Sequence, residues 1–308
     1  MTQPPSDADI KAGLASAGYI CNDRIALTLF LARALEKPVL VEGPPGVGKT
    51  ELARASAQYF GRDLIRLQCY EGLDEAKALY EWKYGKQLLY TQVLKDKLGE
   101  LLRGTDNLAE AMERLYQVDD LFYSRRFLEP RPLLQALTAE QGTVLLIDEI
   151  DKADQEFESF LLEMLADYQV SIPELGTLQA TTRPLVLLTS NNTRELSDAL
   201  KRRCLHLFIP FPDAELERRI LASRVPGIRE QLRRQLVAFV QEVRTLDLKK
   251  QPAISETIDW ARTLVLLHAE ALAPELVTDT LNVLLKHEED IRTVQDQLRQ
   301  LFSRLFKG

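Results

Sequence analysis

The stretch that decides the fold is Gly43-Pro44-Pro45-Gly46-Val47-Gly48-Lys49-Thr50, which fits G-x-x-x-x-G-K-T at every position. A short apolar run that favours β structure precedes it at 38–42. Residues 51–58 are strong helix formers without a breaker. The sequence therefore predicts a strand, a glycine-rich loop and a helix, which is the arrangement of a phosphate-binding loop.

This loop predicts a site for a nucleoside triphosphate. Glycines allow successive backbone N–H groups to turn inward toward phosphate oxygens, and the N-terminus of the following helix adds a partial positive charge. We expect Lys49 to reach the β- and γ-phosphates and the Thr50 hydroxyl to bind Mg²⁺. The whole stretch from Gly43 to Glu51 is therefore predicted to bind nucleotide.

Composition sets the outer limits of the prediction. The chain has 308 residues, of which 45% are hydrophobic and 28% charged, enough for one large or two ordinary domains. A net charge of −7 argues against a protein that coats nucleic acid, and no apolar run is long enough to span a bilayer. No signal peptide is visible, so we expect a cytoplasmic location. Cys21, Cys69 and Cys204 are widely spaced, which indicates free thiols rather than a disulfide framework.

Strand and helix candidates alternate as far as residue 209, which predicts an α/β fold: a parallel sheet in a three-layer α-β-α sandwich. The expected strands are 38–42, 63–69, 143–148, 184–189 and 205–209. Expected helices cover 7–17, 22–36, 51–58 and 155–167, and a hairpin turns around Gly176. An insert at about 70–130, which includes Trp82 and Tyr84, is predicted to contain helices at 86–103 and 107–118.

Two prolines, Pro210 and Pro212, mark a change in the character of the sequence. Beyond them no strand pattern appears, and apolar residues recur at helical spacing in 232–243, 255–270, 274–286 and 289–306. We therefore expect a nucleotide-binding α/β domain at 1–212 and an α-helical domain at 213–308.

Two carboxylates follow the apolar run 144–147, namely Asp148 and Glu149. The carboxyl ends of parallel strands form the ligand-binding edge of such a sheet. Asp148 is therefore expected to hold Mg²⁺ opposite Thr50, and Glu149 to orient and polarise an attacking water. A glutamate in this place favours hydrolysis over transfer to a small acceptor. Because the chain lacks N-K-x-D, we prefer ATP to GTP.

Two further polar positions each have two interpretations. Asn191 ends another buried strand, where it could simply form a turn or could place an amide that helps to position the water. Arg202 and Arg203 come just before the strand at 205–209. They could be solvated surface residues, or they could reach the γ-phosphate bound by a neighbouring subunit.

Together these features resemble the AAA+ ATPases over essentially the whole chain, and within them the MoxR group and its CoxD-like branch. The stretches 39–50, 146–153 and 169–182 support the MoxR group, and the stretches 189–191, 194–200, 202–204 and 256–261 support the CoxD-like branch. The resemblance makes Asn191 the sensor-1 residue and Arg203, with Arg202 beside it, the arginine finger. It also places adenine beside Tyr19 and Ile20. The sensor-2 arginine that many MoxR proteins carry is missing near Thr257. The insert around Trp82 lies where relatives often face a pore or a substrate, but its aromatic residues could equally pack a surface loop.

The resemblance implies a ring-forming ATPase, expected to be a hexamer, that uses ATP and Mg²⁺ as a chaperone in metalloenzyme maturation. The implied client is a molybdenum hydroxylase such as carbon monoxide dehydrogenase, and the implied partner is a protein with a von Willebrand factor A domain. Nucleic acid is not expected to bind. Two alternatives stay open: a DNA-directed AAA+ motor, and a nucleotide-gated binding module with little hydrolysis.

Overall fold

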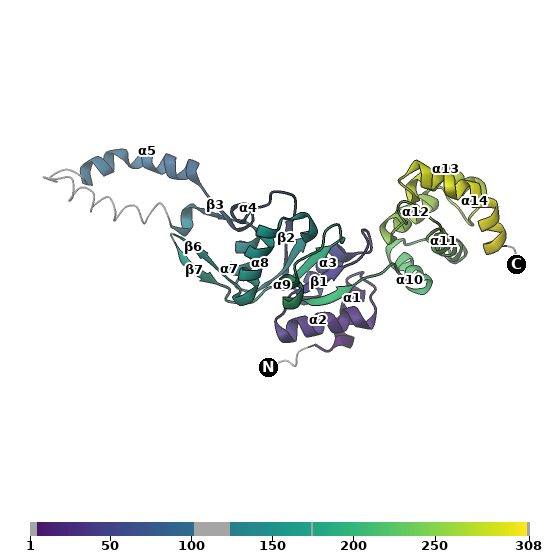
Figure 1. Ribbon diagram of the computed structural model, residues 1–308, viewed down its shortest axis with the longest axis horizontal. Helices are drawn as coiled ribbons and strands as arrows, with labels where there is room; N and C mark the ends of the chain where they lie inside the picture. Colours follow the sequence, from purple (N-terminus) through teal and green to yellow (C-terminus); the bar gives the residue numbers. More distant parts are fainter. Residues whose placement is uncertain (1–4, 102–123, 174, 307–308) are drawn as a thin grey trace.

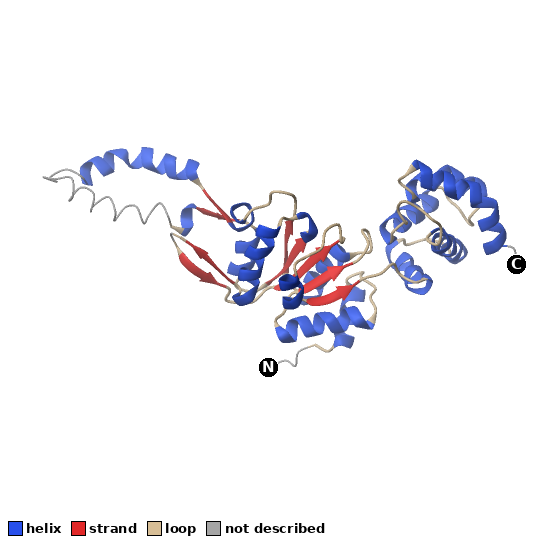
Figure 2. Cartoon of the chain, in the orientation of Figure 1, coloured by secondary structure: helices blue, strands red, loops and turns tan. Residues whose placement is uncertain are grey.

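The computed structural model describes residues 5–101, 124–173 and 175–306. Its centre is a parallel five-stranded sheet with the strand order β2-β5-β8-β1-β9 and helices on both faces (Figures 1 and 2). The α/β class predicted from the sequence is confirmed, and each expected strand is found within two residues of its predicted bounds. The strands are β1 (Val39–Glu42), β2 (Asp63–Gln68), β5 (Thr143–Asp148), β8 (Leu185–Ser190) and β9 (Leu205–Phe208).

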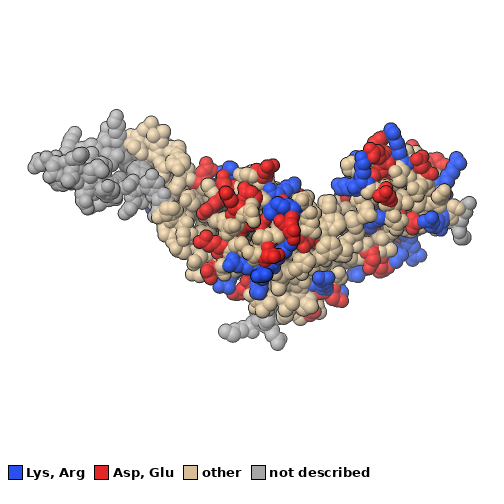
Figure 3. Space-filling model, in the orientation of Figure 1, with Lys and Arg blue, Asp and Glu red and all other residues tan. Residues whose placement is uncertain are grey.

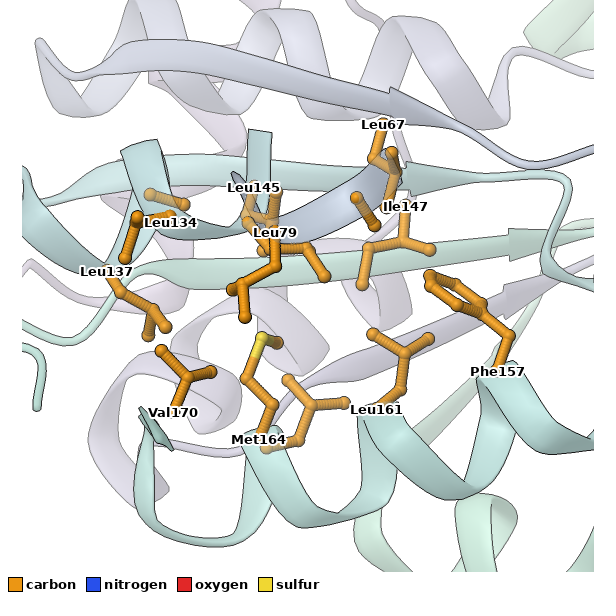
Figure 4. Close-up of a cluster of buried hydrophobic side chains, with 14 of the residues drawn as sticks. Leu67, Leu79, Leu134, Leu137, Leu145, Ile147, Phe157, Leu161, Met164 and Val170 are labelled. Carbon is orange, nitrogen blue, oxygen red and sulfur yellow. The ribbon is translucent and has the colours of Figure 1, made fainter. Parts of the chain in front are cut away.

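The sheet separates two hydrophobic cores because successive side chains of a strand point to opposite faces. Val39 and Val41 pack into one core, whereas Leu40 packs into the other. The first core is covered by α1 (Asp7–Ser16), α2 (Asp23–Leu35) and α3 (Lys49–Phe60). The second, shown in Figure 4, is covered by α7 (Pro132–Thr138), α8 (Gln155–Asp167) and α9 (Asp198–Arg203). Burial on both faces explains why the central strands are continuous apolar runs.

The insert begins within the second core. Leu79 and Trp82 are buried there, at the end of α4 (Glu75–Leu79) and in β3 (Tyr80–Trp82), which pairs antiparallel with β4 (Leu128–Pro130). From there α5 (Tyr84–Leu101) extends away from the body (Figure 1), and Tyr84 is exposed. The short β3–β4 sheet and the 3₁₀ turn η1 (Arg125–Phe127) were not predicted. The helix expected at 107–118 lies outside the described residues.

Charge is distributed unevenly over these parts. Acidic and basic side chains are interspersed on the face drawn in Figure 3. Between Tyr84 and Val93, by contrast, Lys86 alone is charged, and Leu88, Leu89 and Val93 are exposed.

The predicted hairpin is present as β6 (Gln169–Ile172) and β7 (Gly176–Gln179).

After β9, every element in the described part of the chain is a helix. The helices are α10 (Ala214–Arg224), α11 (Glu230–Val243), α12 (Ile254–Leu266), α13 (Pro274–Leu284) and α14 (Glu288–Phe306). They enclose a third core around Phe239 and Trp260. We call residues 214–306 the helical region. Within the described residues, no helix is both long enough and apolar enough to cross a membrane.

A buried ion pair ties the helical region together. The Arg244 guanidinium donates two hydrogen bonds to the Glu217 carboxylate, at 2.7 and 2.8 Å, and both side chains are buried. Arg244 also donates to the Pro252 carbonyl (2.7 Å) and to Thr257 Oγ1 (3.3 Å), and its guanidinium lies 5.2 Å from the centre of the Phe211 ring. One side chain thus joins α10, α11, α12 and the linker from the sheet.

Candidate nucleotide-binding and hydrolysis site

The predicted phosphate loop, residues 43–48, connects β1 to the start of α3. Gly43, Gly46 and Gly48 have φ values of 151°, 78° and 96°, which residues with a side chain rarely adopt. A Cβ atom at Gly43 would collide with the Ile209 carbonyl, and one at Gly46 would lie 2.5 Å from Ser255 Oγ. The loop therefore requires glycine both for its curl and for the close approach of the neighbouring chain, and the N-terminus of α3 faces it.

Lys49 places its ammonium group inside this loop. Its Nζ donates hydrogen bonds to the carbonyls of Gly43 (2.5 Å) and Pro44 (2.8 Å) and to Asn191 Oδ1 (2.7 Å). Burial lowers the pKa of Lys49 to about 8, although the negative charges of Asp151 and the neighbouring carboxylates oppose that shift. The lysine is thus held beside the position where phosphate oxygens are predicted to bind.

Thr50 and Asp148, predicted from the sequence to share Mg²⁺, lie together. Thr50 Oγ1 donates to Asp148 Oδ1 at 3.2 Å, and Thr189 Oγ1 donates to the same oxygen at 2.5 Å. Hydroxyl and carboxylate oxygens are ligands that suit Mg²⁺, so these residues fit the ion. In the ranges that the structure describes, no group of three or more His, Cys, Asp or Glu side chains could hold a metal ion. Magnesium would therefore need further oxygens, as phosphates supply.

Glu149 lies directly beside the lysine site. Its carboxylate accepts hydrogen bonds from Asn191 Nδ2 (3.2 Å) and Gln68 Nε2 (2.9 Å) and forms an ion pair with Lys152 (2.6 Å). Its backbone adopts a left-handed conformation with φ 58°, which few non-glycine residues do. Since Asn191 also accepts from Lys49, one amide joins the phosphate loop to the carboxylate that was predicted to act on water.

Several residues of this network were missed in the sequence. From β2, Arg66 contacts Asp148 and Gln68 contacts Glu149. Asp151 anchors the turn after β8 by accepting hydrogen bonds from the backbone N–H groups of Asn191 (3.2 Å) and Thr193 (3.0 Å). Burial would raise the pKa of Asp151, but hydrogen bonds from Thr193 and Asn191 outweigh it and lower the pKa. The sequence could have indicated these residues, because each is polar and lies near the carboxyl end of a predicted strand.

A cavity of about 240 Å³ lies beside the loop. It lies between the five-stranded sheet with its covering helices, which we call the sheet domain, and the helical region. Tyr19 and Ile20, the predicted adenine contacts, line it together with Val47, Pro210 and Ile258. Tyr19 is buried, which raises its pKa. A mostly apolar wall next to a phosphate loop suits a purine base.

The helical region reaches the loop through residues other than a sensor-2 arginine. The Ser255 backbone N–H donates to the Gly46 carbonyl at 3.3 Å, and Arg224 Nη1 donates to Glu51 Oε1 at 3.0 Å. Thr257, near which a sensor-2 arginine was expected and is missing, is buried, and its hydroxyl oxygen accepts a hydrogen bond from Arg244. The start of α12 therefore contacts the loop itself, and the end of α10 contacts the first turn of α3.

The structure does not bring Arg202 and Arg203 to the site of their own chain. They end α9, where Arg203 donates to the Leu162 carbonyl, and both line a separate surface cavity beside α8. Leu205 pairs with Val39 at the start of β1, whereas the phosphate loop follows the other end of that strand. The first and last residues of a four-residue strand, which rises about 3.3 Å per residue, are roughly 10 Å apart.

Two relatives with similar sequences are both named as uncharacterized proteins. "Uncharacterized protein YojN" of Bacillus subtilis is 26% identical over 230 residues, covering 72% of this chain and 64% of that protein. The chain thus spans less than two thirds of that relative. "Uncharacterized protein SAUSA300_1302" of Staphylococcus aureus is 24% identical over 238 residues, covering 75% of this chain and 76% of the relative.

The chain is also similar to solved structures, and it matches one family model. The Thermotoga maritima RuvB Holliday junction branch migration motor aligns with a TM-score of 0.44 and 17% identity, covering 92% of this chain and 75% of that one. A proline-to-glycine mutant of the same RuvB aligns with a TM-score of 0.49 and 18% identity, covering 98% and 85%. The model of the ATPase family associated with various cellular activities (AAA) matches residues 39–212, more than half of the chain, and the protein therefore belongs to this family.

Proposed function

We propose that this chain hydrolyses ATP and acts as a ring-forming, MoxR-type chaperone in metalloenzyme maturation, with an α/β domain at 1–212 and a helical lid domain at 213–308. The observation that carries the proposal is the hydrogen-bonded chain from Lys49 through Asn191 to Glu149. It joins the residue that would bind phosphate to the one that would accept a proton from water. Binding of nucleotide alone would need only the loop.

Each residue of the site has its own role in the proposed binding and hydrolysis of ATP. Backbone N–H groups of the loop and Lys49 would bind the β- and γ-phosphates, with the adenine in the cavity beside Tyr19. When Mg²⁺ is bound by Thr50 and Asp148, it supplies positive charge that offsets the charge on the phosphates. Glu149 would orient the attacking water and take its proton, and Asn191 would hold the glutamate in place.

The remaining half of the site would come from a second copy. Arg202 and Arg203 are remote from their own phosphate loop, and arginines that reach a neighbour's γ-phosphate stabilise the charge of the transition state. An interface that joins two different surfaces of the same chain is heterologous and closes into a ring when the rotation allows. We propose a hexamer.

The client is proposed from the CoxD-like stretches at 189–191, 194–200, 202–204 and 256–261. It would be a molybdenum hydroxylase such as carbon monoxide dehydrogenase, opened for metal-cofactor insertion with help from a von Willebrand factor A domain protein. Cells that lack this chain should accumulate the hydroxylase as a full-length polypeptide with a deficient metal content. A fully metallated enzyme from such cells would remove this client from the proposal.

The hydrolytic function is tested by steady-state ATP turnover of the wild type, Glu149→Gln and Glu156→Gln. Glu156 is an exposed glutamate on α8 and serves as the matched control. We expect Glu149→Gln to lose about 100-fold or more in turnover while still binding ATP, and the control to match the wild type. Sizing with and without ATP should show assembly. Unchanged turnover in Glu149→Gln would remove it as the base, and hydrolysis that depends on DNA would favour a DNA-directed motor.

A further inference from the structure

Arg66 holds the carboxylate that was predicted to help bind magnesium. The parallel register pairs Gln68 with Asp148 and Arg66 with Leu146, so Arg66 and Asp148 lie on the same face of neighbouring strands, two positions apart. Arg66 donates to Asp148 Oδ2 from both Nε (3.0 Å) and Nη2 (2.6 Å). About half of the Arg66 side chain is exposed, whereas that of Asp148 is almost fully buried.

These contacts use up the acceptor capacity of Asp148. Oδ1 accepts from Thr189 Oγ1 (2.5 Å) and Thr50 Oγ1 (3.2 Å), and Oδ2 accepts the two bonds from Arg66. A carboxylate offers about four lone-pair positions. With Arg66 in place, Asp148 has no position left for a metal ion or for a water bound to one.

The same arginine is connected to Glu149. Arg66 Nη2 donates to Gln68 Oε1, and Gln68 Nε2 donates to Glu149 Oε2 at 2.9 Å. The Gln68 amide is therefore oriented by Arg66 and Glu149, with weaker contacts from its Nε2 to the carbonyls of Cys69 (3.4 Å) and Asp148 (3.5 Å). A movement of Arg66 away from Asp148 would also free the amide that restrains Glu149.

We infer that Arg66 is a latch: it occupies Asp148 Oδ2 through two hydrogen bonds and must leave this carboxylate when a divalent cation binds with nucleotide. This inference rests on the proposed function of the site. A guanidinium and a divalent cation on one carboxylate repel each other, and the half-exposed arginine is the group that can move into water. The buried carboxylate remains to receive the cation. Arg66 thereby sets the Mg²⁺ concentration at which the cation binds, and it links metal binding to release of the contact between Gln68 and Glu149, while Asn191 and Lys152 still hold the glutamate.

The test is a Mg²⁺ titration of the full chain at a fixed concentration of a fluorescent ADP analogue, followed by its emission. We expect Arg66→Met to lower the Mg²⁺ concentration at half-saturation by about three- to tenfold, with analogue binding in EDTA unchanged. Arg183→Met is the matched control, because Arg183 is similarly exposed and makes an ion pair of the same 2.6 Å length with Glu36, a pair that lies outside the site. It should titrate like the wild type.

Arg66→Lys provides a second variant that keeps the charge but loses the two-nitrogen contact. Its half-saturation should lie between those of the wild type and Arg66→Met. An unchanged or higher Mg²⁺ requirement in Arg66→Met, or in Arg66→Lys should the first variant not fold, would overturn the latch and make Arg66 a group that orients Asp148 for the metal. If the wild-type protein does not bind the analogue at all, the proposed function itself fails, which distinguishes the two failures.

Discussion

We expect Arg244→Met to destabilise the helical region and to leave the sheet domain unaffected. The variant removes the two guanidinium N–H groups that donate to Glu217, whose side chain is fully buried, and so leaves this carboxylate without its ionic partner. Removing one member of a buried pair costs about 3–5 kcal/mol. We expect the lower end of this range, because Gln241 still donates to Glu217 at 2.6 Å. The loss is large beside the roughly 5–15 kcal/mol that stabilises a typical domain.

The two tryptophans lie in different hydrophobic cores, so the unfolding of each core can be followed separately. Trp82 is buried in the core of the sheet domain, and Trp260 lies in the core of the helical region, where it donates to Thr280 Oγ1 at 2.8 Å. In a Trp82→Phe background, urea unfolding followed by fluorescence reports on Trp260 alone. Arg244→Met should lower this midpoint, whereas the Trp82 signal in a Trp260→Phe background should not move.

Two further variants make the reasoning refutable. Arg262→Ala removes an exposed pair with Asp259 (3.5 Å) in the same region and should change the free energy of unfolding by no more than about 0.5 kcal/mol. Glu217→Leu combined with Arg244→Met removes both charges and should be more stable than Arg244→Met alone. A change below about 1 kcal/mol in Arg244→Met, or a double variant that is less stable than the single one, would refute the role assigned to this pair.

Three other outcomes follow from the site. Gly46→Ala should weaken ADP binding about tenfold or more by calorimetry, because its Cβ would lie 2.5 Å from Ser255 Oγ at a φ of 78°; equal affinity would contradict the tight approach. Asn191→Ala should reduce kcat about 100-fold with a smaller effect on ADP affinity, and a loss of affinity alone would contradict its role beside Glu149. Arg224→Ala should weaken ADP binding by only about threefold, more at low salt, since its pair with Glu51 is partly exposed; an effect independent of salt would argue against an ionic contact.

The main elements of the fold could be predicted because their patterns are long and regular. The runs 144–147 and 185–188 could hardly be anything but buried strands, and the stripe on α11 has helical spacing over four turns. The three-residue strands β3 and β4 were missed, since three residues are too few to show alternation. Trp82 was therefore predicted either to face a pore or a substrate or to pack a surface loop, whereas tertiary packing buries it in the core.

The centre of the site could be predicted for a topological reason. Lys49, Asp148 and Asn191 each lie at or beyond the end of a strand of one parallel sheet, and the carboxyl ends of such strands meet at one edge. The position of β2 next to β5 could not be predicted in the same way, because strand order is set by tertiary packing. Arg66 therefore appeared to be an ordinary polar residue of an alternating strand, and its contact with Asp148 emerged only from the structure.

The central claim is that ATP is hydrolysed between subunits, with the phosphate loop on one and the arginines on the next. The most direct measurement is ATP turnover by an equal mixture of Lys49→Ala and Arg202→Ala/Arg203→Ala, assembled together, beside each variant alone. Each variant alone should be inactive. Random mixing places an intact loop against intact arginines at about a quarter of the interfaces, so the mixture should recover about that share of wild-type turnover. A mixture of co-assembled subunits as inactive as its components would contradict the account.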